Sequence, residues 1–456
     1  MSKAYLLTML VILGWGPMLC PAWAEEKKSD PEITLTLDEC INIALKRNDN
    51  IIDARRLLSI SNMNVEGAKA AFLPTMRTNF NFSQRVTGPR ERALFDPVLG
   101  FVSGLTESRT TEGYGASASF SQSIYAGGRR FAQYFQAKEN LKRTGSDLEA
   151  IKNQVVYQVK NEFYTLLKGQ KLLEVRQAAI QQSEESLRKA QTLYEIGSAP
   201  MSDILDARAS LELDRVAVIT AEHEVSKARS RLNFTLGFDV NRDIGLVEEI
   251  PRVEEMKATY EEALKTAIEV HPALQRSRYD LESRKHGINV AKSGKRPDVS
   301  MSFSYSWGKD PNVEFLGLED LFMKDFNYSF QVGVSLPVFD GFQTDVNIRR
   351  ARLEYLRSEE NLTQTEKNIK LNLKIALLGV EEAEKRIAAS EEAVKAAEES
   401  FKFAQERYNF GAGTILERLE AQVRLTSAQA DHVRALYDYK LAQAVLALEI
   451  GKPVPR

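Results

Sequence analysis

The sequence predicts a mainly α-helical protein that also contributes strands to a membrane β-barrel, built from a duplicated helix-strand-strand-helix-helix repeat. Three observations predict this fold class: an internal duplication, helical stretches far longer than those of globular domains, and strands on which large apolar residues alternate with small polar ones. The 456 residues carry a formal net charge of -2, so charge gives no reason to expect a nucleic-acid partner.

The N-terminus predicts a signal peptide over residues 1–24. A lysine precedes a short apolar run, and Ala22–Ala24 has the small-x-small pattern of a cleavage site. A membrane anchor is the alternative, but the run is too short to span a bilayer and is interrupted by glycine and proline. Lipidation of Cys20 is a further alternative, although Leu19 stands where lipoprotein signals place a small residue. Cleavage leaves Cys40 as the only cysteine, so no internal disulfide is expected.

The two halves of the mature chain are duplicates. The segment LDECINIALKRNDNIIDAR aligns with YEEALKTAIEVHPALQRSR at a constant offset, which shortens once, at a loop, and then holds. The alignment divides the chain into an N-terminal segment (25–36), a first repeat (37–236), a connector (237–259), a second repeat (260–450) and a C-terminal tail (451–456).

Each repeat shows the same order of elements. A capping box, Thr36-x-x-Glu39 or Thr259-x-x-Glu262, begins one helix that runs to Pro74 or Pro297. Strands are then predicted at about 74–84 and 113–125 in the first repeat, and at about 297–308 and 327–339 in the second. Long helices without proline follow at about 129–194 and 202–236, and at about 342–409 and 415–450.

The long helices alone leave two architectures open. At 1.5 Å per residue the longest would extend roughly 100 Å, which is too long for a single globular core. An antiparallel coiled coil or a repeat solenoid in solution fits the helices as well as a membrane-attached cylinder does.

The strands favour the membrane. In VSMSFSYSW, from Val299 to Trp307, every odd position is apolar and every even position is serine, and the other three strands alternate similarly. Alternation over about ten residues is typical of a tilted strand between lipid and a water-filled lumen, whereas a half-buried sheet of a soluble sandwich is the alternative. The residues expected to face lipid are Phe80, Phe82, Phe120, Met301, Phe303, Tyr305, Phe330, Val332 and Val334.

Strand number then predicts the assembly. Four strands cannot close a barrel, and an open edge in hydrocarbon leaves backbone groups unpaired. Two copies would give an eight-stranded barrel filled by side chains, whereas three give twelve strands and room for a channel. We therefore expect a homotrimer with a twelve-stranded membrane β-barrel that continues into a long α-helical barrel below the membrane.

Several motifs recur in order along the two repeats. They are the LTLDECINIAL opening, His271–Leu274, the corners Tyr125–Gly128 and Phe339–Gly341, and the turns after Tyr194 and Tyr408, with Asp203–Asp206 and Glu417–Glu420. In their order, duplication and spacing they resemble the TolC-like outer-membrane efflux, or channel-tunnel, family over nearly the whole mature chain. The resemblance implies a trimer in outer-membrane lipid with a long periplasmic α-helical barrel. It also implies a passive, gated exit duct that works with a periplasmic adaptor (membrane fusion) protein and an inner-membrane pump of the RND, ABC or MFS type, in tripartite efflux or type I secretion.

The resemblance implies a periplasmic gate at the helical turns. It places Glu417 and Glu420 in acidic rings at the entrance, where close like charges would raise carboxylate pKa values and attract cations; Asp203 and Asp206 are equivalent in the first turn. An acidic helix N-terminus is the plainer interpretation of these residues. Tyr408 matches a tyrosine of the family's closing network.

The turns are also the expected contact with the adaptor. The residues concerned are Gly197, Ser198, Gly411, Ala412 and Gly413, although simple turn geometry explains the glycines equally well. The family's latching arginine is replaced here by Gly413, which puts an ionic latch in doubt.

No enzyme, cofactor or metal site is expected. The four histidines, at 223, 271, 286 and 432, are scattered, and no phosphate-binding glycine loop occurs, so the energy for transport must come from a partner. The connections at about 85–113 and 308–326 are expected to be extracellular loops. A soluble periplasmic coiled-coil scaffold or adaptor is the competing function.

Overall fold

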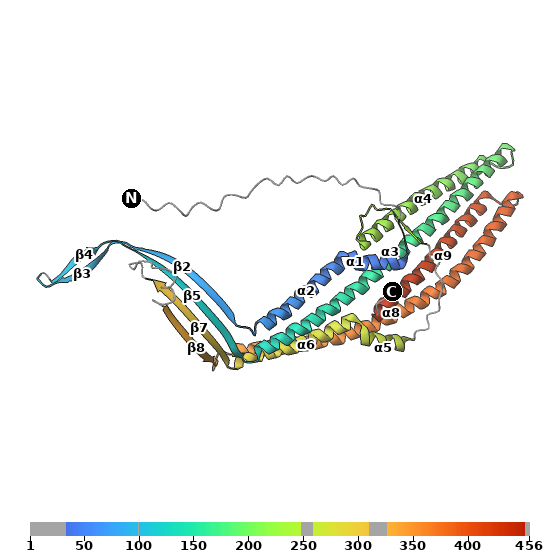
Figure 1. Ribbon diagram of the computed structural model, residues 1–456. Coiled ribbons are helices and arrows are strands. Elements are labelled where there is room, and N and C mark those ends of the chain that lie inside the picture. The colour runs from blue at the N-terminus through green and yellow to red at the C-terminus, as the bar shows by residue number, and fades with distance from the viewer. Residues whose placement is uncertain (1–32, 99, 248–258, 310–325, 452–456) are drawn as a thin grey trace.

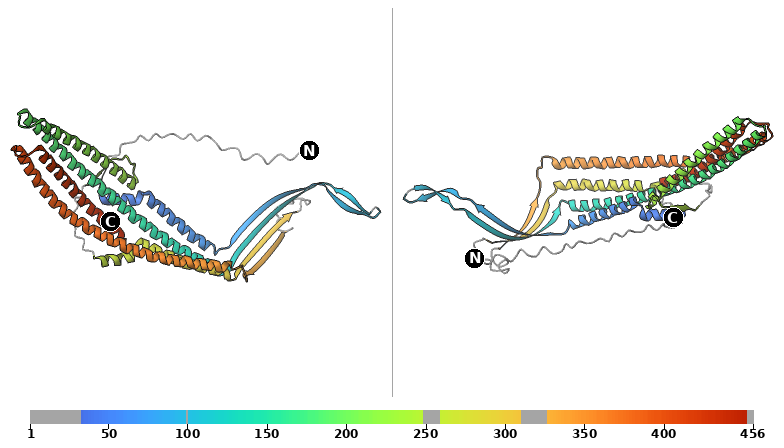
Figure 2. Two further views of the ribbon diagram at one scale, coloured as in Figure 1. Left: turned by 180° about the vertical axis from the view of Figure 1, so that it is seen from behind. Right: turned by 90° about the horizontal axis from the view of Figure 1, so that it is seen from above.

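The computed structural model describes residues 33–98, 100–247, 259–309 and 326–451 and shows an elongated chain (Figure 1). The sheet and the turns of the longest helices occupy opposite ends of the molecule (Figure 2). The predictions for the signal peptide, for most of the second connection and for most of the C-terminal tail lie outside the described residues. Within these residues, no helix is both long and apolar enough to cross a membrane.

The two repeats have matching elements. The first contains α1 (Leu37–Arg47), α2 (Asp49–Ala70), β2 (Thr75–Thr87), β5 (Arg109–Ala126), α3 (Arg129–Glu195) and α4 (Met201–Leu236). The second contains α5 (Tyr260–Val270), α6 (Pro272–Lys292), the 3-10 turn η1 (Ser293–Lys295), β7 (Asp298–Lys309), β8 (Phe326–Ser335), α8 (Gln343–Asn409) and α9 (Ile415–Ile450). Both α3 and α8 have 67 residues, and both α4 and α9 have 36.

The opening helix of each repeat was expected to be continuous, and this was wrong. Asn48 is extended and separates α1 from α2; its side chain accepts the Asn50 N–H and donates to the Thr235 carbonyl at 2.9 Å. His271 separates α5 from α6 in the same way, with Nδ1 accepting the Ala273 N–H. Both side chains cap the helix that follows them, which favours a restart over continuation.

Four antiparallel strands form one sheet in the order β2-β5-β7-β8. Each strand leads directly into or out of a helix, and α2, α3, α6 and α8 run side by side in the matching order (Figure 2, right). The sheet and this layer of helices therefore form one continuous curved wall.

Two strand predictions need correction. The connection 85–113 is not a loop, because β2 and β5 extend into it and a hairpin of β3 (Arg90–Asp96) and β4 (Gly100–Thr106) continues the ribbon. The strand predicted at 327–339 ends at Ser335, since Pro337 has no N–H to donate to a ladder.

The main core lies midway along the helices. It joins α1, α3 and α4 with a short parallel pair, β1 (Ile33–Leu35) and β6 (Ile244–Leu246), and includes Phe163, Leu166 and Leu232. A second cluster joins α5, α8 and α9. Cys40 is a buried free thiol in the first cluster, and burial raises its pKa to about 12.

Candidate functional site

The register of the sheet gathers the large apolar side chains on one face. Phe303 lies opposite Phe120 and Phe330, and Tyr305 lies opposite Tyr328. Because directly paired residues point to the same side of a sheet, the register places the whole predicted set together. The remaining members are Phe80, Phe82, Met301, Val332 and Val334.

This apolar face is largely uncovered in the described chain. Phe80 is 81% exposed, Phe330 63% and Val334 68%. The other face is lined by serines, and Ser304 and Ser329 share a hydrogen bond of 2.7 Å. Contiguous exposed apolar surface of this kind marks a lipid or protein contact.

A β-bulge interrupts the alternation at the end of β5. Ser123 pairs with Ser300 and Tyr125 with Val299, so Ile124 is the extra residue. Strict alternation along β5 would place Ile124 on the apolar face, whereas the bulge brings Tyr125 there, opposite Val299. Trp307, the last apolar residue of the alternating stretch in β7, is 6% exposed and therefore buried within the chain.

The turns between the long helices have equivalent backbones. Gly197 (φ +72°) and Gly411 (φ +70°) are left-handed, and no atom lies within 4 Å of a Cβ built on either. The N–H groups of Ser198 and Ala412 donate at 2.8 Å to carbonyls of the preceding helices. These glycines are thus required by backbone conformation, and their outer sides are open.

Gly413 has a different role. A Cβ there would lie 3.1 Å from both the Arg407 side chain and Glu417 Oε2. Arg407 uses this space, donating to the Ala412 carbonyl at 3.0 Å and pairing with Glu417 at 3.4 Å. An arginine therefore lies beside this turn, although Gly413 itself carries no side chain.

The acidic residues predicted for the gate fall into two groups. Glu417 and Glu420 are exposed and each has an arginine partner, Arg407 at 3.4 Å and Arg424 at 3.8 Å. The Glu417 N–H also donates to Thr414 Oγ1 at the start of α9, so the helix-cap interpretation holds for its backbone. Asp206 is exposed as well.

Asp203 and Tyr408 are brought together from α4 and α8. Tyr408 is 5% exposed, and burial, followed by the nearby Asp203 carboxylate, raises the pKa of its hydroxyl. These residues link the α3–α4 hairpin to the α8–α9 hairpin close to their turns. Lys189 of α3 donates to Asn409 across the same boundary.

Arg418 and Gln422 are the residues that sequence reasoning missed. Both are 2% exposed, one helical turn apart on α9, and the Arg418 guanidinium lies 6.0 Å from the centre of the Tyr408 ring. Gln422 donates to Ser183 Oγ at 2.8 Å, while its Oε1 and the Arg418 Nε and Nη1 are buried without a hydrogen-bond partner. The signal was available, since Ile415, Arg418, Leu419 and Gln422 share the helical spacing of a buried face.

No group of three or more His, Cys, Asp or Glu side chains within the described ranges could hold a metal ion.

Comparison with known proteins gives a consistent result. A family model described as outer membrane efflux protein matches residues 40–238 and 263–452. The outer membrane protein TolC of Vibrio cholerae is 20% identical over 441 residues, covering 96% of this chain and 91% of that protein. Protein CyaE of Bordetella pertussis is 26% identical over 372 residues, covering 78% and 76%.

Solved structures share the fold at lower identity. The Campylobacter jejuni CmeC outer membrane channel superimposes with a TM-score of 0.78 at 16% identity, covering 94% of this chain and 90% of that one. The open state of the Neisseria gonorrhoeae MtrE outer membrane channel gives 0.72 at 19% identity, covering 91% and 88%.

Proposed function

This chain belongs to the outer membrane efflux protein family, and from that membership and the geometry of its sheet we propose that it forms a passive, gated, trimeric duct. It is an outer-membrane protein with a periplasmic portion, and it serves as an exit duct of an efflux or secretion system. Family and relatives are channel proteins, and no reaction is proposed for this chain.

The observation that carries the proposal is the sheet. Among the described strands it has free edges at β2 and β8, and one of its faces is predominantly apolar. Three copies, each pairing β8 with the β2 of its neighbour, would satisfy both edges in a closed barrel, with the apolar face in lipid and the serines toward water. A soluble scaffold would leave this face and both edges without a partner.

The helical wall supports the same assembly. Because α2, α3, α6 and α8 continue the four strands in order, three copies would continue the barrel as a ring of helices. With 67 residues at 1.5 Å each, α3 and α8 extend roughly 100 Å from the sheet, a length suited to crossing much of the periplasm.

The gate is proposed at the boundary between the two hairpins. The contacts near the turns include the polar ones of Asp203 with Tyr408, Gln422 with Ser183 and Lys189 with Asn409, whereas the larger apolar clusters lie farther from the turns. Water can replace polar partners at low cost, so the turns can separate while the larger clusters stay packed. Opening would then consist of moving the two hairpins apart at their ends.

Channels of this family are trimeric and work with adaptors and inner-membrane pumps. For this chain we assign the adaptor contact to the open outer sides of the turns, at Gly197, Ser198, Gly411, Ala412 and Gly413. Ser198→Cys and Ala412→Cys are the preferred crosslinking sites, because cysteine at Gly197 or Gly411 would be strained at positive φ. The native Cys40 is buried with a raised pKa and should not compete for the reagent.

Reconstitution tests the proposal. The purified protein should be a trimer extracted from outer membranes by detergent, and it should conduct ions in planar bilayers. A monomer that stays in solution without detergent and conducts no current would overturn it.

A further inference from the structure

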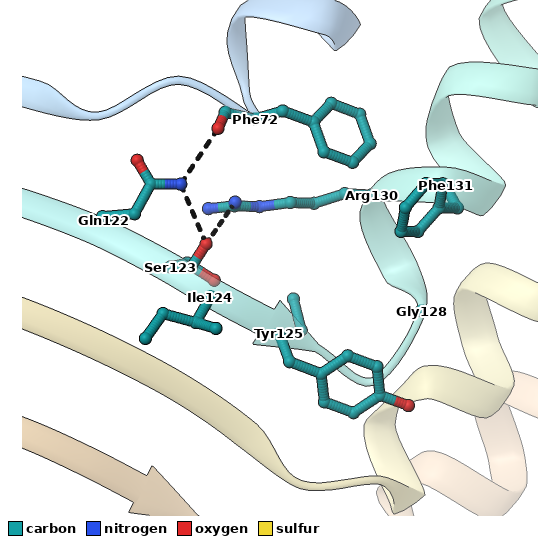
Figure 3. A pocket seen from close by; sticks show the side chains of 9 residues that line it. Phe72, Gln122, Ser123, Ile124, Tyr125, Gly128, Arg130 and Phe131 are labelled. Carbon is teal, nitrogen blue, oxygen red and sulfur yellow. Dashed lines mark hydrogen bonds between the residues drawn. The ribbon is translucent and has the colours of Figure 1, made fainter.

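A small cavity lies at the corner where β5 turns into α3. Its volume is about 130 Å³, and it is bordered by Phe72 at the end of α2, by Gln122 to Tyr125 of the bulged strand end, and by Arg130 and Phe131 of α3 (Figure 3). The corner is flanked by β2 and β7 rather than by the free edges of the sheet. Closure of the barrel would therefore leave it uncovered.

The polar groups of this cavity are incompletely used. Arg130 Nη1 donates to the Ser123 carbonyl at 2.7 Å, and Gln122 Nε2 donates to the carbonyls of Phe72 at 2.9 Å and Ser123 at 3.1 Å. Gln122 Oε1 and Ser123 Oγ are buried there without any hydrogen-bond partner. The cavity thus presents a cation with five N–H donors, of which the Ser123 carbonyl takes one, next to two oxygens able to accept.

Apolar surface adjoins these polar groups. Ile124 is 59% exposed, Phe131 61% and Tyr125 42%, and the Phe131 ring packs edge-on against Phe72 at 5.0 Å. A ligand that satisfies the whole corner needs an anion for Arg130, a donor for the two oxygens and a hydrocarbon part for the exposed rings.

The depth of this corner in the membrane indicates which ligand meets these requirements. In the proposed duct, the apolar face of the strands spans the hydrocarbon and ends here, so the cavity meets the headgroups of the periplasmic leaflet. Aromatic residues are enriched at this depth, and arginine there meets phosphate.

We propose that this cavity is a binding site for the headgroup of a glycerophospholipid. The phosphate pairs with Arg130, the headgroup amine or hydroxyl donates to Gln122 Oε1 and Ser123 Oγ, and the acyl chains lie along Phe131 and Tyr125. The assignment rests on the proposed function, because it takes the orientation in the membrane from it.

The test uses the full oligomer in detergent, with dioctanoyl phosphatidylethanolamine and inorganic phosphate as separate probes and native mass spectrometry as the readout. Arg130→Gln should weaken lipid binding on the order of tenfold or more, since it removes a charge-assisted contact. Arg129→Gln is the matched control, because Arg129 is exposed, lies outside the cavity and pairs with Asp298 at 3.7 Å. Gln122→Glu, which keeps Arg130 but sets a carboxylate against the phosphate, should also weaken binding.

Lipid binding that is lost in Arg130→Gln and Gln122→Glu but kept in Arg129→Gln supports the site. Equal binding by all variants, or inorganic phosphate binding as tightly as the lipid, would overturn the lipid assignment. Single-channel conductance is measured on the same samples: if wild type and variants conduct while lipid binding is absent, the site fails and the duct stands. If none conducts, the duct itself is in question.

Discussion

Replacing Arg418 with methionine should make the two helical hairpins harder to separate. Arg418 is 2% exposed, and its Nε and Nη1 have no acceptor. Each buried, unsatisfied polar group costs about 1–3 kcal/mol, and an apolar side chain of similar length removes that cost. The opposing losses are the contact with the Tyr408 ring at 6.0 Å, worth about 2 kcal/mol at most, and the weaker attraction of the exposed Glu185 carboxylate.

Two unsatisfied groups cost about 4 kcal/mol when the middle of this range is taken for each. After the lost ring contact is subtracted, the closed arrangement of the hairpins is more stable in the variant by about 2 kcal/mol per chain. That difference changes an equilibrium constant roughly thirtyfold. If opening requires the hairpins to part, the open probability of the Arg418→Met channel should fall by about that factor, and by more if the chains open together.

Single-channel recording in planar bilayers measures the open probability directly. The midpoint temperature of thermal unfolding is a second readout, and it should be higher in the variant. Arg424→Met serves as the control, because Arg424 is an exposed arginine on the same helix, paired with Glu420 at 3.8 Å. A channel that opens more often after Arg418→Met would refute the reasoning, since the guanidinium would then be holding the hairpins together.

Three further predictions follow from the site and the sheet. Burial lowers the pKa of His271 below its usual 6.5, so the unfolded chain binds the proton first and stability is lost as pH falls from about 6.5 toward the folded value. His271→Asn, which supplies the cap that Asn48 provides in the other repeat, should reduce the loss of stability between pH 7.5 and pH 5 in chemical denaturation; an unchanged loss would exclude His271 as its source. Phe303→Asp should abolish detergent-resistant oligomers on native gels while Ser304→Asp is tolerated, because a charge on the lipid face costs about 2–4 kcal/mol in each chain for Lys or Arg and somewhat less for Asp, and this cost is repeated in every chain of the oligomer; equal tolerance at both sites would contradict the assigned orientation of the sheet. Arg407→Ala combined with Arg424→Ala should raise cation preference in reversal-potential measurements, since Glu417 and Glu420 lose their partners, whereas Glu417→Ala with Glu420→Ala should lower it; unchanged selectivity in both would remove these charges from the pore.

The features that depend on local pattern could be predicted from the sequence. Duplication and proline-free composition place the four long helices within one residue of their observed ends, and alternation places Phe303 and Phe330 on the same face. The prediction of a continuous opening helix failed at Asn48, because in the sequence a capping residue inside an otherwise helical stretch cannot be distinguished from an ordinary polar residue. The extended ribbon of β3 and β4 was missed because its glycines and proline indicated a loop.

The features that depend on tertiary packing could not be predicted with the same success. The ion pair of Glu420 with Arg424 could be predicted from its i,i+4 spacing on one helix. The ion pair of Glu417 with Arg407 forms across a turn, so predicting it requires the backbone path of that turn. That the Arg418 Nε and Nη1 are left without an acceptor is a property of two hairpins in contact. It can be identified only from a structure, because the positions of all neighbouring hydrogen-bond acceptors are needed.

The equal lengths of α3 and α8 constrain how this protein can vary. One residue inserted into either helix would advance its turn by 1.5 Å and rotate it by about 100°, because there are 3.6 residues per turn. The altered turn would then present a different side to its sister turn and to any docked protein. A length change that preserves the direction of both turns must therefore add close to a whole number of helical turns, for example about 7, 11 or 18 residues, and must occur in both repeats together.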